Sequence, residues 1–240
     1  MGKRASSLPN MVLTLLMITA VAGGSLGFVF QMTKAPIEAA AVAKQQEAIQ
    51  LVVPDFDNDP AAEMYELTSS EGFPLKVFPA RKGEELVGVA IETMSNRGFS
   101  GEIKIMVGLK PDGSIINYQV LEHRETPGLG TKMDDWFKPA VVVEGRKEPG
   151  TRLLDGFFGI KAGESGDTKN ILGKHPGTTR MVVKQDGGEV DAITAATITS
   201  RAFLHAVEVA YTTYTERTDA ASSATTQYNE EEGGDNEPVE

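Results

Sequence analysis

The chain has 240 residues, of which 40% are hydrophobic, and this is enough for one domain with a hydrophobic core and some appended segments. Its formal net charge of −11, with no clustered basic segment, argues against a nucleic-acid partner. The absence of Cys excludes disulfides, thiolate metal sites, Cys-ligated iron–sulfur clusters and a Cys nucleophile in this chain.

Residues 11–30 form an uncharged apolar run, long enough to cross a bilayer core of ~30 Å as a helix. A cleaved signal peptide is the alternative, because small residues follow at 39–43. These lie far beyond the run, which is itself longer than a signal-peptide core of ~7–15 residues. We therefore predict an uncleaved transmembrane helix after a cytoplasmic N-terminus, residues 1–10. Lys3 and Arg4 precede it and Lys34 follows, which favours a cytoplasmic N-terminus.

Residues 31–70 are predicted as a membrane-proximal helical segment, because 35–53 are rich in Ala, Gln and Glu and stop at Pro54. Two hairpins follow, one from strands 75–80 and 86–93 and one from strands 103–109 and 115–121. The alternation of apolar and polar residues predicts a sheet with one covered face. A last hairpin is expected around the turn 184–188.

Residues 191–200 read DAITAATITS and run directly into an amphipathic helix. Hydroxyl side chains at this position supply N-cap oxygens, and the free N–H groups and dipole of the first turn favour an anion. The segment therefore suits a phosphate, although a simple helix cap requires the same residue types. The apolar face of the predicted helix consists of Phe203, Ala206, Val207, Ala210, Tyr211 and Tyr214.

The order of residues in this segment resembles the flavinylation motif of a family of FMN-binding proteins. That family includes the G subunit of the Rnf ion-translocating ferredoxin:NAD oxidoreductase and the C subunit of the sodium-translocating NADH:quinone reductase. One residue departs from the usual pattern: Ala195 stands where many members have Gly, which matters if the turn needs a positive φ angle. Because Ala is also small, we expect the turn to accept it. The matching residues are Asp191, Thr194, Ala195, Ala196, Thr197, Thr199 and Ser200.

A second segment resembles the same family, whose signature Glu-Thr-Pro-Gly-Leu-Gly occurs here without departure. The likeness extends over about residues 98–210 and includes the Gly-Phe-Ser-Gly turn at 98–101. We predict that this loop contacts flavin, because its glycines allow close backbone approach and Thr126 can bond to the polar edge of the ring. For Glu125, holding the loop is favoured over contact with the ring. The loop residues are Glu125, Thr126, Pro127, Gly128, Leu129 and Gly130.

The resemblance implies an α+β protein: an N-terminal transmembrane helix followed by one extracytoplasmic FMN-binding domain with an antiparallel or mixed sheet. It implies that FMN is joined to Thr197 by a phosphoester bond, which a separate flavin transferase makes from FAD. The domain is predicted at residues 71–215 and a disordered acidic tail at 216–240. The implied location is the bacterial inner membrane. Membrane lipid and the other membrane and iron–sulfur subunits of an Rnf-type complex are the expected partners, and the chain is not expected to be catalytic alone.

Three alternatives remain at this point. The first is that the chain is the C subunit of the quinone reductase, although His123 and the order of residues 191–202 resemble the Rnf G subunit more. A membrane-tethered binding module without cofactor would explain the Thr cluster as a helix cap alone. A hydrolase with Thr197 or Ser200 as nucleophile lacks a recognisable base motif.

Overall fold

The computed structural model describes residues 8–139 and 168–231 and separates the chain into two units, Met1–Gln46 and Glu47–Glu240. Helix α1 (Leu8–Val52) is continuous through Pro36 and contains the expected span. It is long and apolar enough to cross a membrane, with a mean hydropathy of 2.1 over its most apolar 18 residues, none of which is buried. The prediction that the helix runs on from the span and stops before Pro54 is confirmed.

A five-stranded antiparallel sheet forms the centre of the second unit, with neighbouring strands joined in chain order. Both predicted hairpins are confirmed: the first is β2 with β3 and the second is β4 with β5. The edge strand β1 was not predicted and lies in the segment expected to be helical. Its four residues alternate polar and apolar side chains, which suits a strand but is too short to give a clear periodic signal. The strands are β1 (Tyr65–Thr68), β2 (Pro74–Lys82), β3 (Glu85–Gly98), β4 (Gly101–Leu109) and β5 (Ile115–His123).

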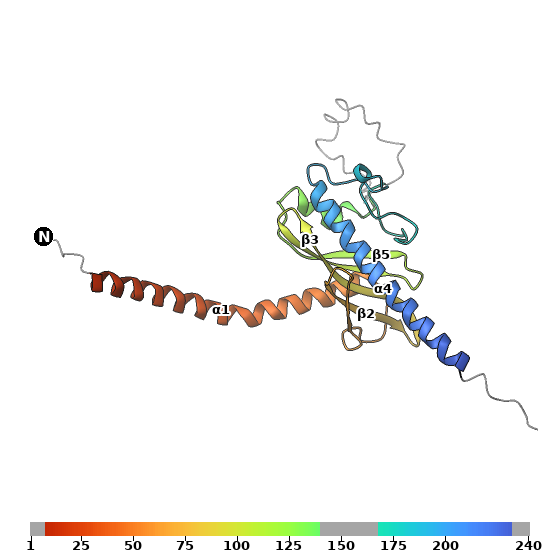
Figure 1. Cartoon of the computed structure of the whole chain (residues 1–240), viewed down its shortest axis with the longest axis horizontal. Helices are drawn as coiled ribbons and strands as arrows, with labels where there is room; N and C mark the ends of the chain where they lie inside the picture. The colour runs from red at the N-terminus through yellow and green to blue at the C-terminus, as the bar shows by residue number, and fades with distance from the viewer. Residues whose placement is uncertain (1–7, 140–167, 232–240) are drawn as a thin grey trace, which may run out of the picture. The chain divides into compact units, whose positions relative to one another are not determined.

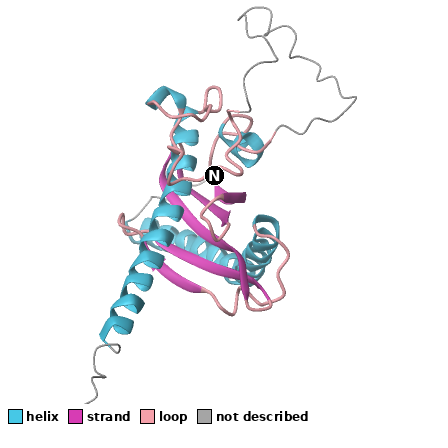
Figure 2. Ribbon diagram, turned by 90° about the vertical axis from the view of Figure 1, so that its right-hand side faces the viewer, coloured by secondary structure: helices cyan, strands magenta, loops and turns pink. Residues whose placement is uncertain are grey.

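The two faces of the sheet bury different partners, because successive side chains of a strand point to opposite sides. One face carries residues such as Ile91, Ile105 and Val107 and packs against helix α4 (Thr197–Glu231). Figure 2 shows this helix lying across the strands. The opposite face, with Phe78 and Met106, packs against the last turns of α1. The sheet is thus covered on both faces, where one covered face was expected.

Helix α4 continues to Glu231, well past residue 216, where a disordered tail is predicted to begin (Figure 1). The prediction of disorder is wrong for residues 216–231, and residues 232–240 lie outside the described residues. Composition misled here: the segment is rich in Ser, Thr and Glu, but it contains neither Gly nor Pro, so nothing interrupts the helix that the apolar residues before it begin.

The segment before α4 contains short turns and, within its described residues, no paired strands. The hairpin expected around residues 184–188 is wrong: Val183 and Val190 form only an isolated bridge, around the 3₁₀ helix η2 (Lys184–Asp186). After β5 the chain makes the 3₁₀ helix η1 (Gly130–Lys132) and the short helix α2 (Met133–Trp136). These irregular segments connect the sheet to the start of α4.

Candidate functional site

A tight turn delivers the chain into α4, and Ser200 holds this turn from the inside. The Ile193 amide donates to Ser200 Oγ at 2.9 Å, and the Ser200 hydroxyl donates to the carbonyl of Ala196 at 3.0 Å. Ser200 is fully buried. Its position therefore explains how the turn is built and leaves the hydroxyl no access to a ligand or substrate.

Ala195 has a φ angle of +63°, and among the described residues it is the one non-glycine residue in the left-handed region. The turn therefore does need a positive φ at the position where the related motif often has Gly. This conformation costs an Ala residue ~1 kcal/mol, because its Cβ approaches the backbone. The expectation that Ala is accepted is met, at the expense of strain in the turn.

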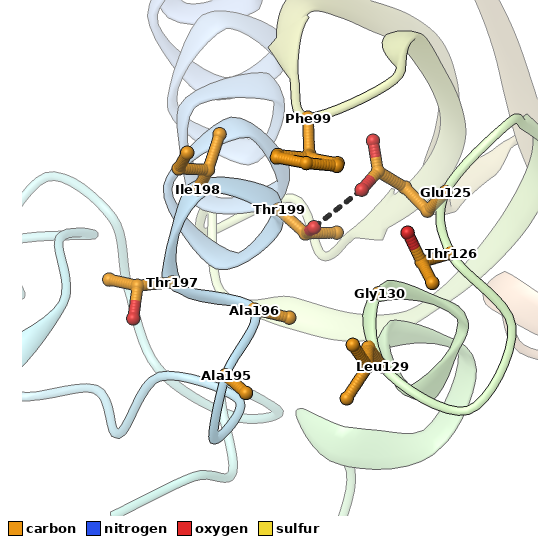
Figure 3. Close-up of a pocket in the computed structure, with 10 residues that line it drawn as sticks. All are labelled: Phe99, Glu125, Thr126, Leu129, Gly130, Ala195, Ala196, Thr197, Ile198 and Thr199. Atoms are coloured by element: carbon orange, nitrogen blue, oxygen red, sulfur yellow. Dashed lines mark hydrogen bonds between the residues drawn. The ribbon is translucent and has the colours of Figure 1, made fainter.

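Thr197 is the first residue of α4 and is half-buried. Its hydroxyl makes no hydrogen bond to any other residue in the described part of the chain. Figure 3 shows its side chain leaving the helix on the side away from Glu125 and Thr199. The first-turn N–H groups of a helix have no partners within the helix, so the Thr197 hydroxyl stands at the positive end of the helix dipole.

A pocket of about 310 Å³ opens beside this helix start. Three segments distant in sequence form its walls: the turn between β3 and β4, the loop after β5, and the first turn of α4 (Figure 3). Its volume is at the lower end of the range for ligand pockets, ~300–1,000 Å³. The lining residues are Phe99, Glu125, Thr126, Leu129, Gly130, Ala195, Ala196, Thr197, Ile198 and Thr199.

Glu125 connects the three walls. Its carboxylate accepts a hydrogen bond from the Thr199 hydroxyl at 2.6 Å and another from the Ser100 amide at 3.1 Å. A Cβ atom on Gly130 would stand 2.7 Å from Glu125 Cβ and 2.9 Å from Thr199 Oγ1, so only glycine lets the loop approach this closely. Glu125 itself is 5% exposed.

Within the loop 125–130, four of the six predicted residues line the pocket and two do not. Gly128 has a φ of +75° and its amide donates to Thr131 Oγ1 at 2.9 Å, so it shapes the turn. Pro127 is exposed beside it. Of the two glycines expected to approach a flavin ring, Gly130 lines the pocket and Gly128 does not.

Asp191 and Thr194 also lie away from the pocket lining. The Asp191 carboxylate pairs with Lys184 Nζ at 2.8 Å and accepts a hydrogen bond from Thr168. Partial burial acts to raise the pKa of Asp191, but the hydrogen bonds from Lys184 and Thr168 outweigh it and hold the pKa below its usual value. Asp191 thus fixes the segment before the turn, and Thr194 is exposed to solvent.

Two pocket residues were not among the predicted site residues. Phe99 is 66% exposed at the tip of the turn between β3 and β4, and Ile198 is 47% exposed on α4. With Leu129, which is 38% exposed, they give the pocket an apolar rim. The signal available in the sequence was an aromatic residue set between two glycines at 98–101, which is unusual for a plain turn.

Comparison with known proteins matches residues 98–212 to the family model of the FMN-binding domain. A protein of Yersinia pestis, named as the G subunit of the ion-translocating oxidoreductase complex, is 35% identical over 82% of this chain and 85% of its own length. Proteins of the same name from Cronobacter sakazakii and Haemophilus influenzae (strain KW20) are 34% and 30% identical, over 84% and 80% of their lengths.

The matched region begins at the turn that carries Phe99, continues through the loop 125–130 and the start of α4, and ends within α4. All three walls of the pocket are therefore included in the FMN-binding domain. The residues present suit a flavin phosphate. The N-terminus of α4 favours an anion, and the Thr197 hydroxyl has no partner among the described residues. Both lie beside a pocket with an apolar rim, which suits a flavin ring. The chain belongs to the family of G subunits of the ion-translocating oxidoreductase (Rnf) complex and carries the FMN-binding domain of that family.

Proposed function

We propose that this chain is an electron-transfer subunit of an Rnf-type ion-translocating complex and that FMN is bound covalently through Thr197. The observation that carries the proposal is the Thr197 hydroxyl: it is unpaired among the described residues, at the first position of α4, on the edge of the pocket. The flavin, when bound, supplies one- and two-electron chemistry, and the protein supplies retention, orientation and electrostatics.

The attachment would form a bond between Thr197 Oγ1 and the phosphorus of the FMN moiety. In the step that the family resemblance implies, a flavin transferase breaks the pyrophosphate bond of FAD, AMP leaves, and the hydroxyl proton is lost. The product keeps a negatively charged phosphodiester. The N-terminus of α4 stabilises that charge through its dipole and its free N–H groups.

The pocket provides a place for the isoalloxazine ring next to this phosphate. The apolar side chains of Phe99, Leu129 and Ile198 can cover the ring faces, and Thr126 offers a hydroxyl to its polar edge. In this proposal Asp191 and Ser200 contribute by shaping the turn that presents Thr197. Pro127 and Gly128 act in the same way on the loop.

The membrane anchor in this proposal is residues 11–30 of α1, with the N-terminus in the cytoplasm and the FMN-binding domain on the extracytoplasmic side of the bacterial inner membrane. Two observations support membrane attachment. Helix α1 is apolar and long enough to cross a bilayer, and the relatives are named as subunits of an ion-translocating complex. The positive charges of Lys3 and Arg4 support the orientation. The partners would be the membrane and iron–sulfur subunits of the complex.

The test compares wild type with Thr197→Ala, each co-expressed with a flavin transferase and denatured before intact-mass and in-gel fluorescence measurement. We expect an FMN-sized mass gain and fluorescence in the wild type and neither in Thr197→Ala. Thr212→Ala, on an exposed position of the same helix, is the matched control and should be flavinylated fully. Flavin that persists in Thr197→Ala would place the attachment elsewhere.

If the wild type carries no flavin under conditions that modify a known member of the family, the proposal of electron transfer through covalently bound FMN is contradicted as a whole. A membrane-tethered module, in which the threonines only cap α4, would then be the better explanation. The two failures can be told apart. Flavin that persists in Thr197→Ala keeps the cofactor and changes only its attachment site, whereas a wild type without flavin removes the cofactor.

A further inference from the structure

The pocket contains a buried carboxylate whose hydrogen-bond partners are both neutral. Glu125 accepts from the Thr199 hydroxyl and from the Ser100 amide, and neither donor carries a charge. In the described part of the chain, no Lys, Arg or His side chain forms an ion pair with it. His123 hydrogen-bonds to the backbone of this residue and not to its carboxylate: the Glu125 amide donates to His123 Nδ1 at 3.2 Å.

This arrangement is costly if its only purpose is to hold the loop. A buried charge without a counter-charge loses much of its hydration energy, and two neutral hydrogen bonds recover only part of it. A neutral side chain could connect the same three walls at lower cost. The negative charge itself therefore calls for an explanation.

We propose that the Glu125 carboxylate is a positioning residue whose charge keeps the reduction potential of the bound flavin low. The proposal rests on the proposed function, because it requires FMN in this pocket. Glu125 lines the pocket and is itself 5% exposed, so the protein around the carboxylate screens its field less than bulk water would. Reduction adds electrons to the flavin, and a nearby fixed negative charge disfavours the reduced form.

Thr199 and Ser100 hydrogen-bond to this carboxylate from two different walls of the pocket. Thr199 is 1% exposed in the first turn of α4, two residues after Thr197, so the helix that would carry the phosphate also orients the carboxylate. The covalent anchor and the charge are thereby fixed to one rigid element. This is the condition under which an electrostatic effect on the flavin is reproducible from molecule to molecule.

The experiment measures the flavin midpoint potential by spectroscopic redox titration of the full chain after flavinylation. Glu125→Gln should raise the potential enough to favour the reduced flavin by about tenfold, which corresponds to ~30 mV for a two-electron couple. Glu122→Gln removes the same charge from a side chain that is 62% exposed and paired with Lys104, and it should leave the potential at the wild-type value.

Thr199→Val separates the charge from the hydrogen bond. It removes the donor and keeps the carboxylate, so the potential should stay at or below that of the wild type. An unchanged potential in flavinylated Glu125→Gln overturns the inference and leaves the proposed function intact. An equal rise in Glu125→Gln and Thr199→Val also overturns it, since pocket geometry would then be the cause.

If Glu125→Gln does not take up flavin, Glu125→Asp is measured beside Thr199→Val. Both keep the negative charge and weaken the hydrogen bonds, so both should retain the low potential, and a rise of the same tenfold size in either would refute the proposal. Failure of the wild type itself to bind flavin concerns the proposed function instead.

Discussion

The carbonyl oxygen of Val52 occupies the place where a Cβ atom on Gly108 would stand. The last turn of α1 therefore rests directly on the backbone of β4, on the face of the sheet opposite to α4. The contact is reinforced by Asn117, which donates to the carbonyl of Leu51 at 2.8 Å. A glycine at 108 is the condition for this close packing.

Gly108→Ala should destabilise the sheet domain by about 1–3 kcal/mol, because the added methyl group forces the end of α1 away from β4. Urea unfolding of the full chain in detergent, followed by the fluorescence of Trp136, measures the change. Gly27→Ala is the matched control: apart from its chain neighbours and the backbone of its own helix, no atom of the described residues lies within 4 Å of the added Cβ, so the unfolding midpoint should not move. Equal midpoints for both variants would contradict the packing described.

Ala195→Gly should stabilise the protein by at most ~0.6 kcal/mol, because glycine relieves ~1 kcal/mol of strain at the positive φ of this turn and gives back at least ~0.4 kcal/mol. The expected gain is reduced by the greater freedom of glycine in the unfolded chain. Chemical denaturation of both proteins gives the difference. Ala196→Gly, at a buried neighbour without a positive φ, should destabilise instead, and a loss of similar size in both variants would argue against strain at Ala195.

Tyr118→Phe should cost about 1–3 kcal/mol through lost hydrogen bonds in the core. The buried Tyr118 hydroxyl donates to the carbonyl of Met133 at 2.8 Å and accepts from the Phe137 amide at 3.2 Å. Burial raises the pKa of Tyr118 far above its usual value, so the hydroxyl remains a neutral donor. The thermal unfolding midpoint of Tyr118→Phe should be lower than that of Tyr211→Phe, because the Tyr211 hydroxyl has no hydrogen bond among the described residues.

The acid stability of the domain should depend on Asp191, whose pKa is held below its usual value by Lys184 and Thr168 against the effect of partial burial. A carboxyl group whose pKa is lower in the folded state than in the unfolded state stabilises the fold at pH values above its unfolded-state pKa, ~3.9 for Asp. This stabilisation is lost as the pH falls through the folded-state pKa.

Asp191→Asn should therefore be less stable than the wild type near neutral pH, and the difference should shrink as the pH falls below the unfolded-state pKa of Asp, ~3.9. Urea midpoints measured across this range test the expectation. Asp55→Asn, at an exposed position without an ion pair among the described residues, should show no such trend. A difference for Asp191→Asn that is the same at every pH would mean that its ion pair does not contribute.

The sequence predicts best what is encoded within a few residues of each element. The two hairpins have alternating side chains and a polar turn between the strands, and α1 has an apolar run before Pro54. Strand β1 is not predicted, because four residues show little periodicity and the strand is stabilised by its pairing with β2 in the folded protein. The continuation of α4 is not predicted, because a segment rich in Ser, Thr and Glu has the composition of a tail even though it contains neither Gly nor Pro.

The candidate site shows the same division. Family resemblance locates both segments that meet at the pocket, but a motif does not say which side chains face inward. Ser200 has the residue type of a ligand-binding group and is instead buried under the turn. Phe99 and Ile198 line the pocket as exposed apolar residues outside any periodic pattern, so only the folded chain identifies them.

The pocket walls come from opposite ends of the domain sequence, and this has a consequence for biosynthesis. Strands β3 to β5 pair with sequence neighbours and can form as the chain emerges, whereas Thr197 and Thr199 arrive about a hundred residues after Phe99. The Glu125–Thr199 hydrogen bond exists only once α4 has docked. A modifying enzyme that recognises the assembled pocket would thus ignore nascent chains and act as a checkpoint that marks only fully folded copies.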